Sequence, residues 1–314
     1  MVNIQKAAII GCGFVGASAA FSLIHKGIFS ELVLIDANQK KAEGEAMDLS
    51  HGRPFAQTMK IYAGSYEDIS DCALIIVTAG ANQKPEEKRL DLVNRNVAIF
   101  QSIIPEITRQ NFEGILLIVT NPVDILTYVA LKLSGYPKER VIGSGTVLDS
   151  ARFRYLLGER LRTDSRSIHA MIIGEHGDSE LAVWSGANVS GIDLPDFCKI
   201  RGYHDHQESM EQIFCNVRDS AYEIIERKGS TCYGVAMAIS RISECIIRNE
   251  HSVLPVSSLM EGEYGLSGLC ISVPTIVARD GAERVLEIPL AEEEKRRLKM
   301  SAEELKEVLS GIEL

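Results

Sequence analysis

Short segments that are apolar at nearly every position recur through the first half of this 314-residue chain. A strand buried on one face alternates apolar and polar residues, whereas these segments do not, which indicates strands covered on both faces. Segments with helical patterns separate them. We predict strands at 6–13, 31–37, 59–64, 72–80, 114–122 and 140–145, and helices at 14–27, 41–52, 92–111 and 123–135. Strands of this kind joined by crossover helices form a doubly wound parallel α/β sheet.

The second half of the chain has a more mixed pattern. We predict strands at 167–177 and 181–191, a hairpin-like pair at 268–279 and 281–289, and helices at 207–228 and 230–248. The chain ends in an amphipathic helix whose apolar stripe is Leu298, Leu305, Leu309 and Ile312. The expected organisation is a doubly wound domain at 1–145 followed by a mixed α+β domain at 146–314.

Charge and cysteine content exclude several classes of protein. The net charge of −10 argues against nucleic acid and anionic membranes as partners, because both require basic patches. The seven cysteines are scattered and form no C-x-x-C pair, which favours reduced thiols in the cytoplasm over a disulfide framework or a zinc site. The uncharged run at 7–24 resembles a signal peptide or a short membrane span, but three glycines interrupt it, so we expect neither.

A glycine motif lies between the first predicted strand and the first helix, with Gly11, Gly13 and Gly16 in the pattern G-x-G-x-x-G. Such glycines permit a tight turn and the close approach of a pyrophosphate to the helix N-terminus. The second predicted strand ends at Asp36, where a carboxylate accepts hydrogen bonds from a ribose diol and repels a 2′-phosphate. These residues predict a Rossmann-type NAD-binding domain, and the alternative is a glycine-rich packing turn.

A candidate acid–base residue, His176, lies between glycines directly after the apolar run IHAMII at 168–173. Histidine transfers protons at neutral pH, but it needs an orienting partner. Asp149 and Arg152 are three residues apart in a helix that we predict to begin after Thr146, and they share one face, so they are a candidate carboxylate partner and anion clamp. The alternative for Asp149 is a negative charge placed favourably in the first turn of a helix.

Seven motifs together resemble the lactate/malate dehydrogenase family over essentially the whole chain. They are GCGFVG, LIDAN, AGANQKP with the following RLDL, TNPVDILTY, VIGSGTVLDSARFR, GEHGDSE and KGSTCYG. The resemblance implies an NAD-dependent enzyme that interconverts pyruvate and L-lactate in the cytoplasm, regenerating NAD for glycolysis or fermentation. It also implies a homotetramer. Because hydride transfer from nicotinamide requires no metal, none is expected.

The resemblance also implies roles for the candidate residues. His176 would be the acid–base, Asp149 would hold its imidazole, and Arg152 would bind the substrate carboxylate through a bidentate fork. Asn121 would hydrogen-bond near the reacting oxygen and Thr231 would line the pocket. The positions that correspond to NAD contacts are Gly11, Gly13, Val15, Gly16, Asp36, Lys41, Tyr66, Gly80, Ala81, Ser102, Thr120, Asn121 and Ser144.

The highly charged stretch at 79–89 follows a buried strand and would ordinarily be interpreted as a solvated loop. The resemblance implies instead a lid from which Arg89 polarises the substrate carbonyl. Gln83 would face the methyl group of pyruvate, whereas malate dehydrogenases resembling this chain have arginine there. The alternative substrate is therefore malate or another 2-hydroxy acid. Many family members have glycine where this chain has Glu86, which bears on lid closure.

Two further positions are similar to those of bacterial lactate dehydrogenases activated by fructose 1,6-bisphosphate. They are Arg154, on the helix face turned away from Asp149, and His169, in the strand before His176. The resemblance implies that both meet their copies across a subunit interface and bind the phosphates of this activator. The alternative is a surface arginine and a strand histidine. A remote alternative for the whole chain is a non-enzymatic NAD-binding protein on the same fold.

Overall fold

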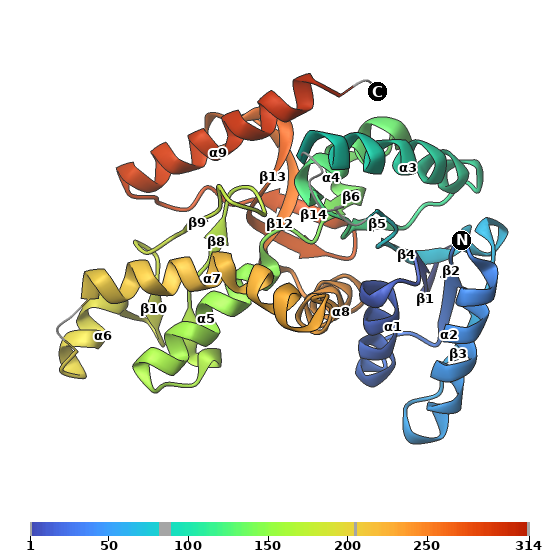
Figure 1. Cartoon of the computed structure of the whole chain (residues 1–314), viewed down its shortest axis with the longest axis horizontal. Coiled ribbons are helices and arrows are strands. Elements are labelled where there is room, and N and C mark those ends of the chain that lie inside the picture. The colour runs from blue at the N-terminus through green and yellow to red at the C-terminus, as the bar shows by residue number, and fades with distance from the viewer. Residues whose placement is uncertain (1, 82–88, 204–205, 313–314) are drawn as a thin grey trace.

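A nine-stranded sheet forms the centre of the molecule in the computed structural model, which describes residues 2–81, 89–203 and 206–312, with backbone alone at 89–90 and 206–209 (Figure 1). Its strand order is β14-β13-β12-β6-β5-β4-β1-β2-β3. The strands are β1 (Asn3–Ile10), β2 (Glu31–Ile35), β3 (Lys60–Ala63), β4 (Cys72–Val77), β5 (Ile115–Ile118), β6 (Val141–Gly143), β12 (Ser252–Glu261), β13 (Ser267–Ala278) and β14 (Gly281–Val285).

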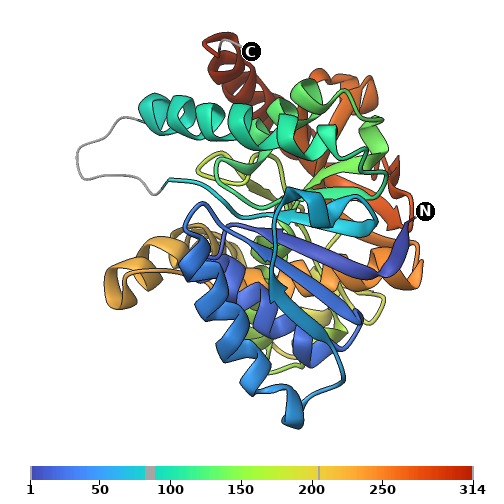
Figure 2. The ribbon, with the colours of Figure 1, turned by 90° about the vertical axis from the view of Figure 1, so that its right-hand side faces the viewer.

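Helices cover both faces of this sheet (Figure 2). The helices of the described residues are α1 (Phe14–Lys26), α2 (Gln39–His51), α3 (Arg89–Arg109), α4 (Val123–Ser134), α5 (Val147–Leu161), α6 (Leu194–Ile200), α7 (His206–Lys228), α8 (Tyr233–Arg248) and α9 (Glu292–Ser310), of which α6 and α7 pack away from this sheet. Strands β1 to β6 pair in parallel in the order β3-β2-β1-β4-β5-β6. The prediction of a doubly wound, Rossmann-type domain is therefore confirmed.

Alternate residues of each parallel strand enter two separate cores. In β1, Ala7 and Ile9 pack with residues of α1, α2 and α8, whereas Ala8 and Ile10 pack with residues of α3, α4 and α9. All four of these side chains are buried. Burial on both faces explains why the sequence of these strands shows no alternation of polar and apolar residues.

The antiparallel part of the sheet was only partly predicted. Strands β13 and β14 form the expected hairpin. However, β12 at 252–261 was missed, although it pairs antiparallel with both β13 and β6 and joins the two halves of the chain in one sheet. Proline is rare inside central strands, and Pro255 of β12 lies opposite Pro274 of β13, so the local sequence argued against a strand.

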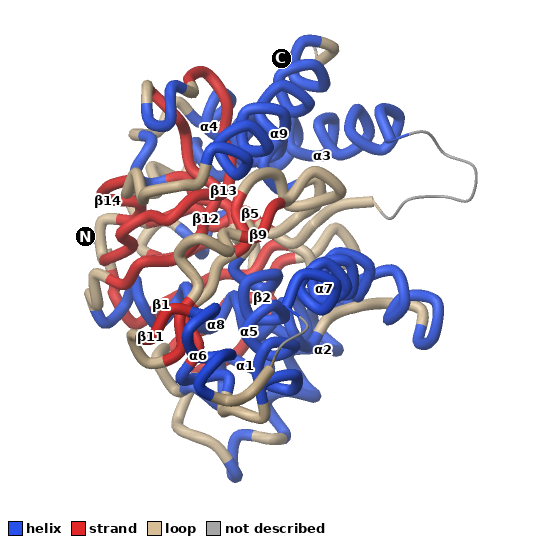
Figure 3. The backbone as a smooth tube through the Cα atoms, turned by 90° about the vertical axis from the view of Figure 1, so that its left-hand side faces the viewer, coloured by secondary structure: helices blue, strands red, loops and turns tan. Residues whose placement is uncertain are grey.

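The strands predicted at 167–177 and 181–191 are each broken into short pieces, which is a correction to the sequence analysis (Figure 3). The pieces are β7 (Ile168–His169), β8 (Ile172–Ile173), β9 (Leu181–Ala182) and β10 (Asn188–Val189), and β11 (Ile192–Asp193) follows just beyond them. Gly174, at φ +97°, ends β8 and hydrogen-bonds to Ser272 of the large sheet. Helices α5, α6 and α7 pack on this region around a third core that contains Phe153, against which the partly buried Trp184 packs.

Some segment boundaries also differ from the prediction. Helix α3 begins at Arg89, three residues before its predicted start, and α9 ends before Ile312 of the predicted stripe. The uncharged run at 7–24 is divided between β1, the glycine turn and α1. Among the helices in the described ranges, none combines the length and the apolar character needed to cross a membrane.

Candidate active site

The loops that follow strands β1, β4 and β5 meet at one edge of the parallel sheet. The Oγ1 atom of Thr78, after β4, donates to the carbonyl oxygen of Gly11 at 2.6 Å. The Oγ1 atom of Thr120, after β5, donates to the carbonyl oxygen of Ala79 at 2.8 Å. The carboxyl ends of parallel strands at a point where the strand order reverses are where such sheets bind ligands.

Asn96 of α3 ties two of these loops together, and sequence reasoning missed it. Its Nδ2 donates to the carbonyl oxygen of Asn121 at 2.8 Å, and its Oδ1 accepts from the backbone N–H of Ala81 at 2.7 Å. The side chain is fully buried. A signal was present in the sequence, because Asn96 is a polar residue on the inward stripe of an amphipathic helix, beside Val93 and Val97.

The glycine turn after β1 fits the pyrophosphate of a dinucleotide. Gly11 has φ +103°, and a Cβ there would lie 2.4 Å from the backbone nitrogen of Ala79. A Cβ on Gly16 would lie 1.9 Å from the carbonyl oxygen of Gly11, so both positions require glycine. Gly13, in contrast, has no atom within 4 Å of an added Cβ, and no described side chain caps α1. Because no side chain of the described residues caps α1, the N–H groups of its first turn keep donor capacity for an anion.

Asp36 is held beside this turn at the end of β2. Its Oδ2 accepts from the backbone N–H of Cys12 at 2.7 Å, and its Oδ1 accepts from the backbone N–H of Asn38 at 2.8 Å. The side chain remains partly accessible. Because a carboxylate oxygen has two lone pairs, Asp36 keeps acceptor capacity for a ribose diol.

The remaining predicted cofactor residues divide into two groups. Gly80, Ala81, Thr120, Asn121 and Ser144 all lie at the carboxyl edge of β4, β5 or β6, and Val15 lies in the first turn of α1. The others lie on elements that flank these strands. Lys41 is exposed on α2, Tyr66 is half-buried after β3, and Ser102 is exposed on α3, where its Oγ donates to the carbonyl oxygen of Ile99.

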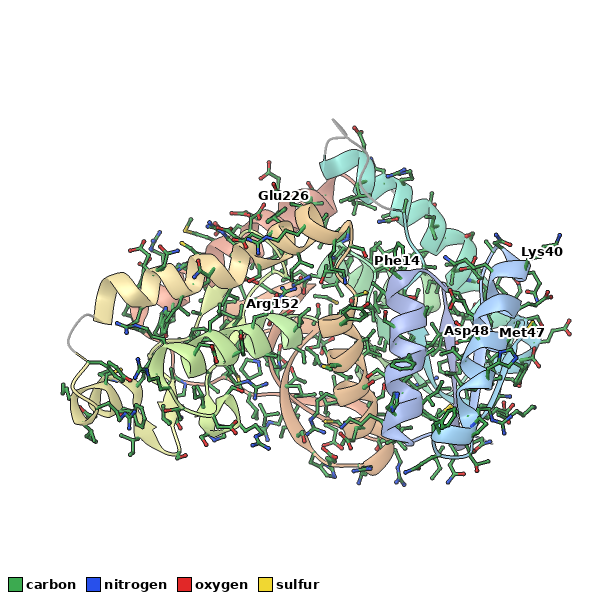
Figure 4. The ribbon with its side chains drawn as sticks, turned by 60° about the horizontal axis from the view of Figure 1, so that its bottom comes forward. Phe14, Lys40, Met47, Asp48, Arg152 and Glu226 are labelled. Atoms are coloured by element: carbon green, nitrogen blue, oxygen red, sulfur yellow. The ribbon has the colours of Figure 1, made fainter. Side chains whose placement is uncertain are left out.

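His176, Asp149 and Arg152 form a compact ionic group beneath the same edge. The Nδ1 atom of His176 lies 2.6 Å from Oδ2 of Asp149, and Nη1 of Arg152 donates to Oδ1 of Asp149 at 2.7 Å. Asp149 is buried, whereas the His176 side chain is 24% exposed. Figure 4 shows Arg152 on α5. The structure thus brings the three candidates together, and both carboxylate oxygens of Asp149 accept from a cationic partner.

These contacts determine the protonation of the histidine. Burial alone would lower the pKa of His176, but the charge and hydrogen bond of Asp149, with smaller contributions from Glu180 and Asp124, raise it to about 9. Burial would likewise raise the pKa of Asp149, and His176 and Arg152 together lower it below its usual value. His176 is therefore a proton donor at neutral pH, beside a guanidinium that suits an anionic substrate.

Asp124 holds the loop that carries His176, and it too was missed as a site residue. Its Oδ2 accepts from the backbone N–H of His176 at 2.8 Å, and its Oδ1 accepts from Oγ of Ser272 at 3.1 Å. Asp124 is buried in the first turn of α4. It lies inside the motif TNPVDILTY, and only the folded chain brings it to His176.

Other predicted site residues are placed as follows. Thr231 is half-buried just before α8. Gln83 and Glu86 lie outside the described residues, and for Arg89 only the backbone is described, at the beginning of α3. Arg154 is half-buried on α5, with its Nε donating to the carbonyl oxygen of Ser150 at 3.4 Å, and His169 is exposed in β7.

The chain matches two family models, which are described as the NAD binding domain of lactate/malate dehydrogenase at residues 5–143 and its alpha/beta C-terminal domain at 146–313. An L-lactate dehydrogenase of Acetivibrio thermocellus is 53% identical over 99% of this chain and 98% of its own length. L-lactate dehydrogenase 1 of Clostridium acetobutylicum is 50% identical over 98% of each chain. The ligand-bound crystal structure of the minor L-lactate dehydrogenase of Enterococcus mundtii has a TM-score of 0.96 and 42% identity, covering 99% of each chain.

Proposed function

Since the chain belongs to the lactate/malate dehydrogenase family, we propose that it is an NAD-dependent L-lactate dehydrogenase that interconverts pyruvate and L-lactate. The observation that carries the proposal is the group formed by His176, Asp149 and Arg152 beside a dinucleotide-binding edge. The proposal is also supported by relatives that are 50–53% identical over nearly the full chain and are named L-lactate dehydrogenases.

In the proposed mechanism, the protonated ring of His176 donates a proton to the pyruvate carbonyl oxygen and takes it back from lactate. Asp149 orients that ring and stabilises its charge. The guanidinium nitrogens of Arg152 that do not contact Asp149 bind the substrate carboxylate. NAD, when bound, supplies the hydride acceptor or donor. The glycine turn, Asp36 and the polar groups after β4, β5 and β6 would hold it, in a cofactor domain at 1–145 next to a catalytic domain at 146–314.

Four further substrate contacts belong to the proposal. Arg89 would polarise the carbonyl from a closing lid, Gln83 would face the methyl group, and Asn121 and Thr231 would complete the pocket. Asn121 is supported by its position after β5, where Asn96 fixes its backbone. The second candidate function, oxidation of malate or another 2-hydroxy acid, depends on what position 83 faces.

The direct test is oxidation of NADH with pyruvate and, in parallel, with oxaloacetate. Pyruvate should give the higher kcat/KM, and NADPH should be a poor substitute for NADH because Asp36 repels a 2′-phosphate. A higher kcat/KM for oxaloacetate would assign the malate reaction instead. The absence of turnover with either, despite binding of NADH, would favour a non-enzymatic role.

Gln83→Arg is expected to shift the ratio of kcat/KM for oxaloacetate to that for pyruvate by about 100-fold or more. The arginine supplies a partner for a second carboxylate, and it leaves an unpaired charge against a methyl group. Steady-state kinetics on both substrates measure this ratio. A ratio close to that of the original enzyme would mean that position 83 does not face the substrate.

We also propose that the enzyme is a cytoplasmic homotetramer of fermentation or glycolysis, with allosteric activation by fructose 1,6-bisphosphate. Assembly is supported by large apolar side chains exposed on helices that pack together: Phe14 and Phe21 on α1, Met47 on α2, and Tyr233 and Met237 on α8. Figure 4 shows Phe14 and Met47 on the neighbouring helices α1 and α2.

The activator site is proposed at Arg154 and His169. Burial lowers the pKa of Arg154 from its ordinary value, and the nearby positive charge of Arg241 lowers it further. A bound phosphate would neutralise the repulsion between Arg154 and Arg241. At a symmetric interface, each of the two subunits would be stabilised in this way.

Fructose 1,6-bisphosphate at millimolar concentration is expected to lower the apparent KM for pyruvate by roughly 5–150-fold, the usual range of allosteric coupling. It should also stabilise the tetramer in sedimentation experiments. The double variant Arg154→Gln with His169→Gln should lose this response and keep maximal turnover. The measurement is made at low enzyme concentration and neutral pH. If the pyruvate saturation curves with and without the effector are the same, the proposed activator site is wrong.

A further inference from the structure

Glu180 is a buried carboxyl group next to the His176–Asp149 pair. It precedes β9 in the loop that carries His176, and it is 3% exposed. One of its oxygens, an oxygen of Asp149 and a ring nitrogen of His176 all lie within 4.8 Å of one another. Its Oε1 is buried and has no hydrogen-bond partner among the described residues. A buried ionised carboxylate without a hydrogen bond is costly, so this geometry favours the protonated form.

The charges around Glu180 come from three elements. Asp149 and Arg152 face it from α5, His176 from its own loop, and Arg218 from α7. Burial, followed by repulsion from Asp149, raises the pKa of Glu180 to about 8, although His176, Arg152 and Arg218 oppose the shift. The three clustered ligand-type side chains do not suggest a metal site, because Asp149 already accepts from Arg152 and His176.

We propose that Glu180 is a positioning residue whose protonated form is required for the substrate carboxylate to bind at Arg152. This inference rests on the proposed function. An ionised Glu180 would be an internal anion close to Arg152, and it would both compete for that guanidinium and repel the incoming carboxylate. Protonated Glu180 leaves the positive charge of Arg152 available, so loss of its proton weakens substrate binding without removing the acid–base group.

The consequence is a pH dependence of substrate binding that does not belong to His176. With pKa values of about 8 for Glu180 and about 9 for His176, the KM for pyruvate should rise between pH 7 and pH 9. Simple titration assigns about tenfold of this rise to Glu180 and about twofold to His176. At saturating pyruvate the bound complex retains both protons, so kcat should vary far less than KM.

The experiment compares the original enzyme with Glu180→Gln, a neutral side chain of the same shape. The rise in pyruvate KM from pH 7 to pH 9 should shrink severalfold in Glu180→Gln, because only the titration of His176 then contributes to it. Asp178→Asn is the matched control, because it removes one negative charge from an exposed position in the same loop. It should keep the full rise. Equal KM profiles in the original enzyme and Glu180→Gln would overturn the inference.

A second measurement separates this inference from the proposed function, because it uses no substrate. A carboxyl group whose folded pKa is raised contributes stability that is present below its unfolded pKa and is lost as pH rises through the folded pKa. At fixed protein concentration, the Tm of the original enzyme should therefore fall relative to that of Glu180→Gln between pH 5 and pH 9. Parallel Tm curves would overturn the inference even in an active enzyme, whereas failure of pyruvate turnover alone would overturn only the proposed function.

Discussion

His176→Asn is expected to lower the turnover of pyruvate by several orders of magnitude while leaving NADH binding intact. A positioned acid–base group contributes about 10²–10⁴-fold to rate by proton transfer alone. The asparagine also has no charge for Asp149 to stabilise, so the buried carboxylate loses one of its two cationic partners. Stopped-flow or steady-state oxidation of NADH gives the turnover, and NADH fluorescence gives the binding.

A matched control is His251→Asn, because His251 is exposed and its Nδ1 lies 2.8 Å from Oε2 of Glu283, in the turn region after α8. Its turnover should match that of the original enzyme. If His176→Asn keeps near-normal turnover, His176 is not the acid–base group and the proposed mechanism fails. If it loses NADH binding as well, the variant has disturbed the fold and the Asp124 contact to the loop must be tested first.

The parallel half of the sheet was predictable because its strands are buried on both faces, and that leaves a signal in local composition. The same kind of signal is absent from β12, where Pro255, Ser257 and Ser258 interrupt the apolar pattern. That strand exists because β6 and β13 supply partners on both sides. Pairing between distant segments can thus override weak local preference.

The ionic group at the candidate site was predictable only in part. The spacing of Asp149 and Arg152 places both on one helix face, and their contact follows from it. Nothing in the spacing brings His176, 27 residues away, to the same carboxylate. That approach depends on Asp124 and Ser272, which anchor the histidine loop to α4 and the large sheet.

Glu180 shows most clearly which properties of the site cannot be predicted from the sequence alone. In the sequence it is an acidic residue at the end of GEHGDSE, and acidic residues are mostly exposed. Its burial next to Asp149 appears only when α5 and the histidine loop pack together. Burial, more than residue type, decides whether such a group carries a charge at neutral pH.

Asp149→Asn is expected to lower pyruvate turnover at pH 7 by about 10³–10⁴-fold, comparable to the loss when the aspartate that orients a catalytic histidine is replaced. Both oxygens of Asp149 accept, one from His176 and one from Arg152. An amide offers one acceptor oxygen and one NH₂ group, so it cannot accept hydrogen bonds from both cationic partners. If its oxygen accepts from Arg152, its NH₂ group faces Nδ1 of His176 and can donate only to an uncharged ring, which disfavours the charged histidine.

The pH dependence of activity in Asp149→Asn shows whether the variant has lost the charge of Asp149 or has lost its folded structure. Burial lowers the pKa of His176 when its carboxylate partner is removed, so the charged ring required for pyruvate reduction should persist only at acidic pH. At saturating pyruvate, the residual activity of Asp149→Asn should therefore increase as pH falls from 8 to 5.5, whereas the original enzyme should stay active until pH approaches about 9. The stability of the original enzyme should also decrease as pH rises through the folded pKa of His176. A histidine whose pKa is raised in the folded state stabilises the fold below its unfolded pKa, and this contribution is lost above its folded pKa. Identical positions of the two activity profiles would mean that Asp149 does not control the protonation of His176.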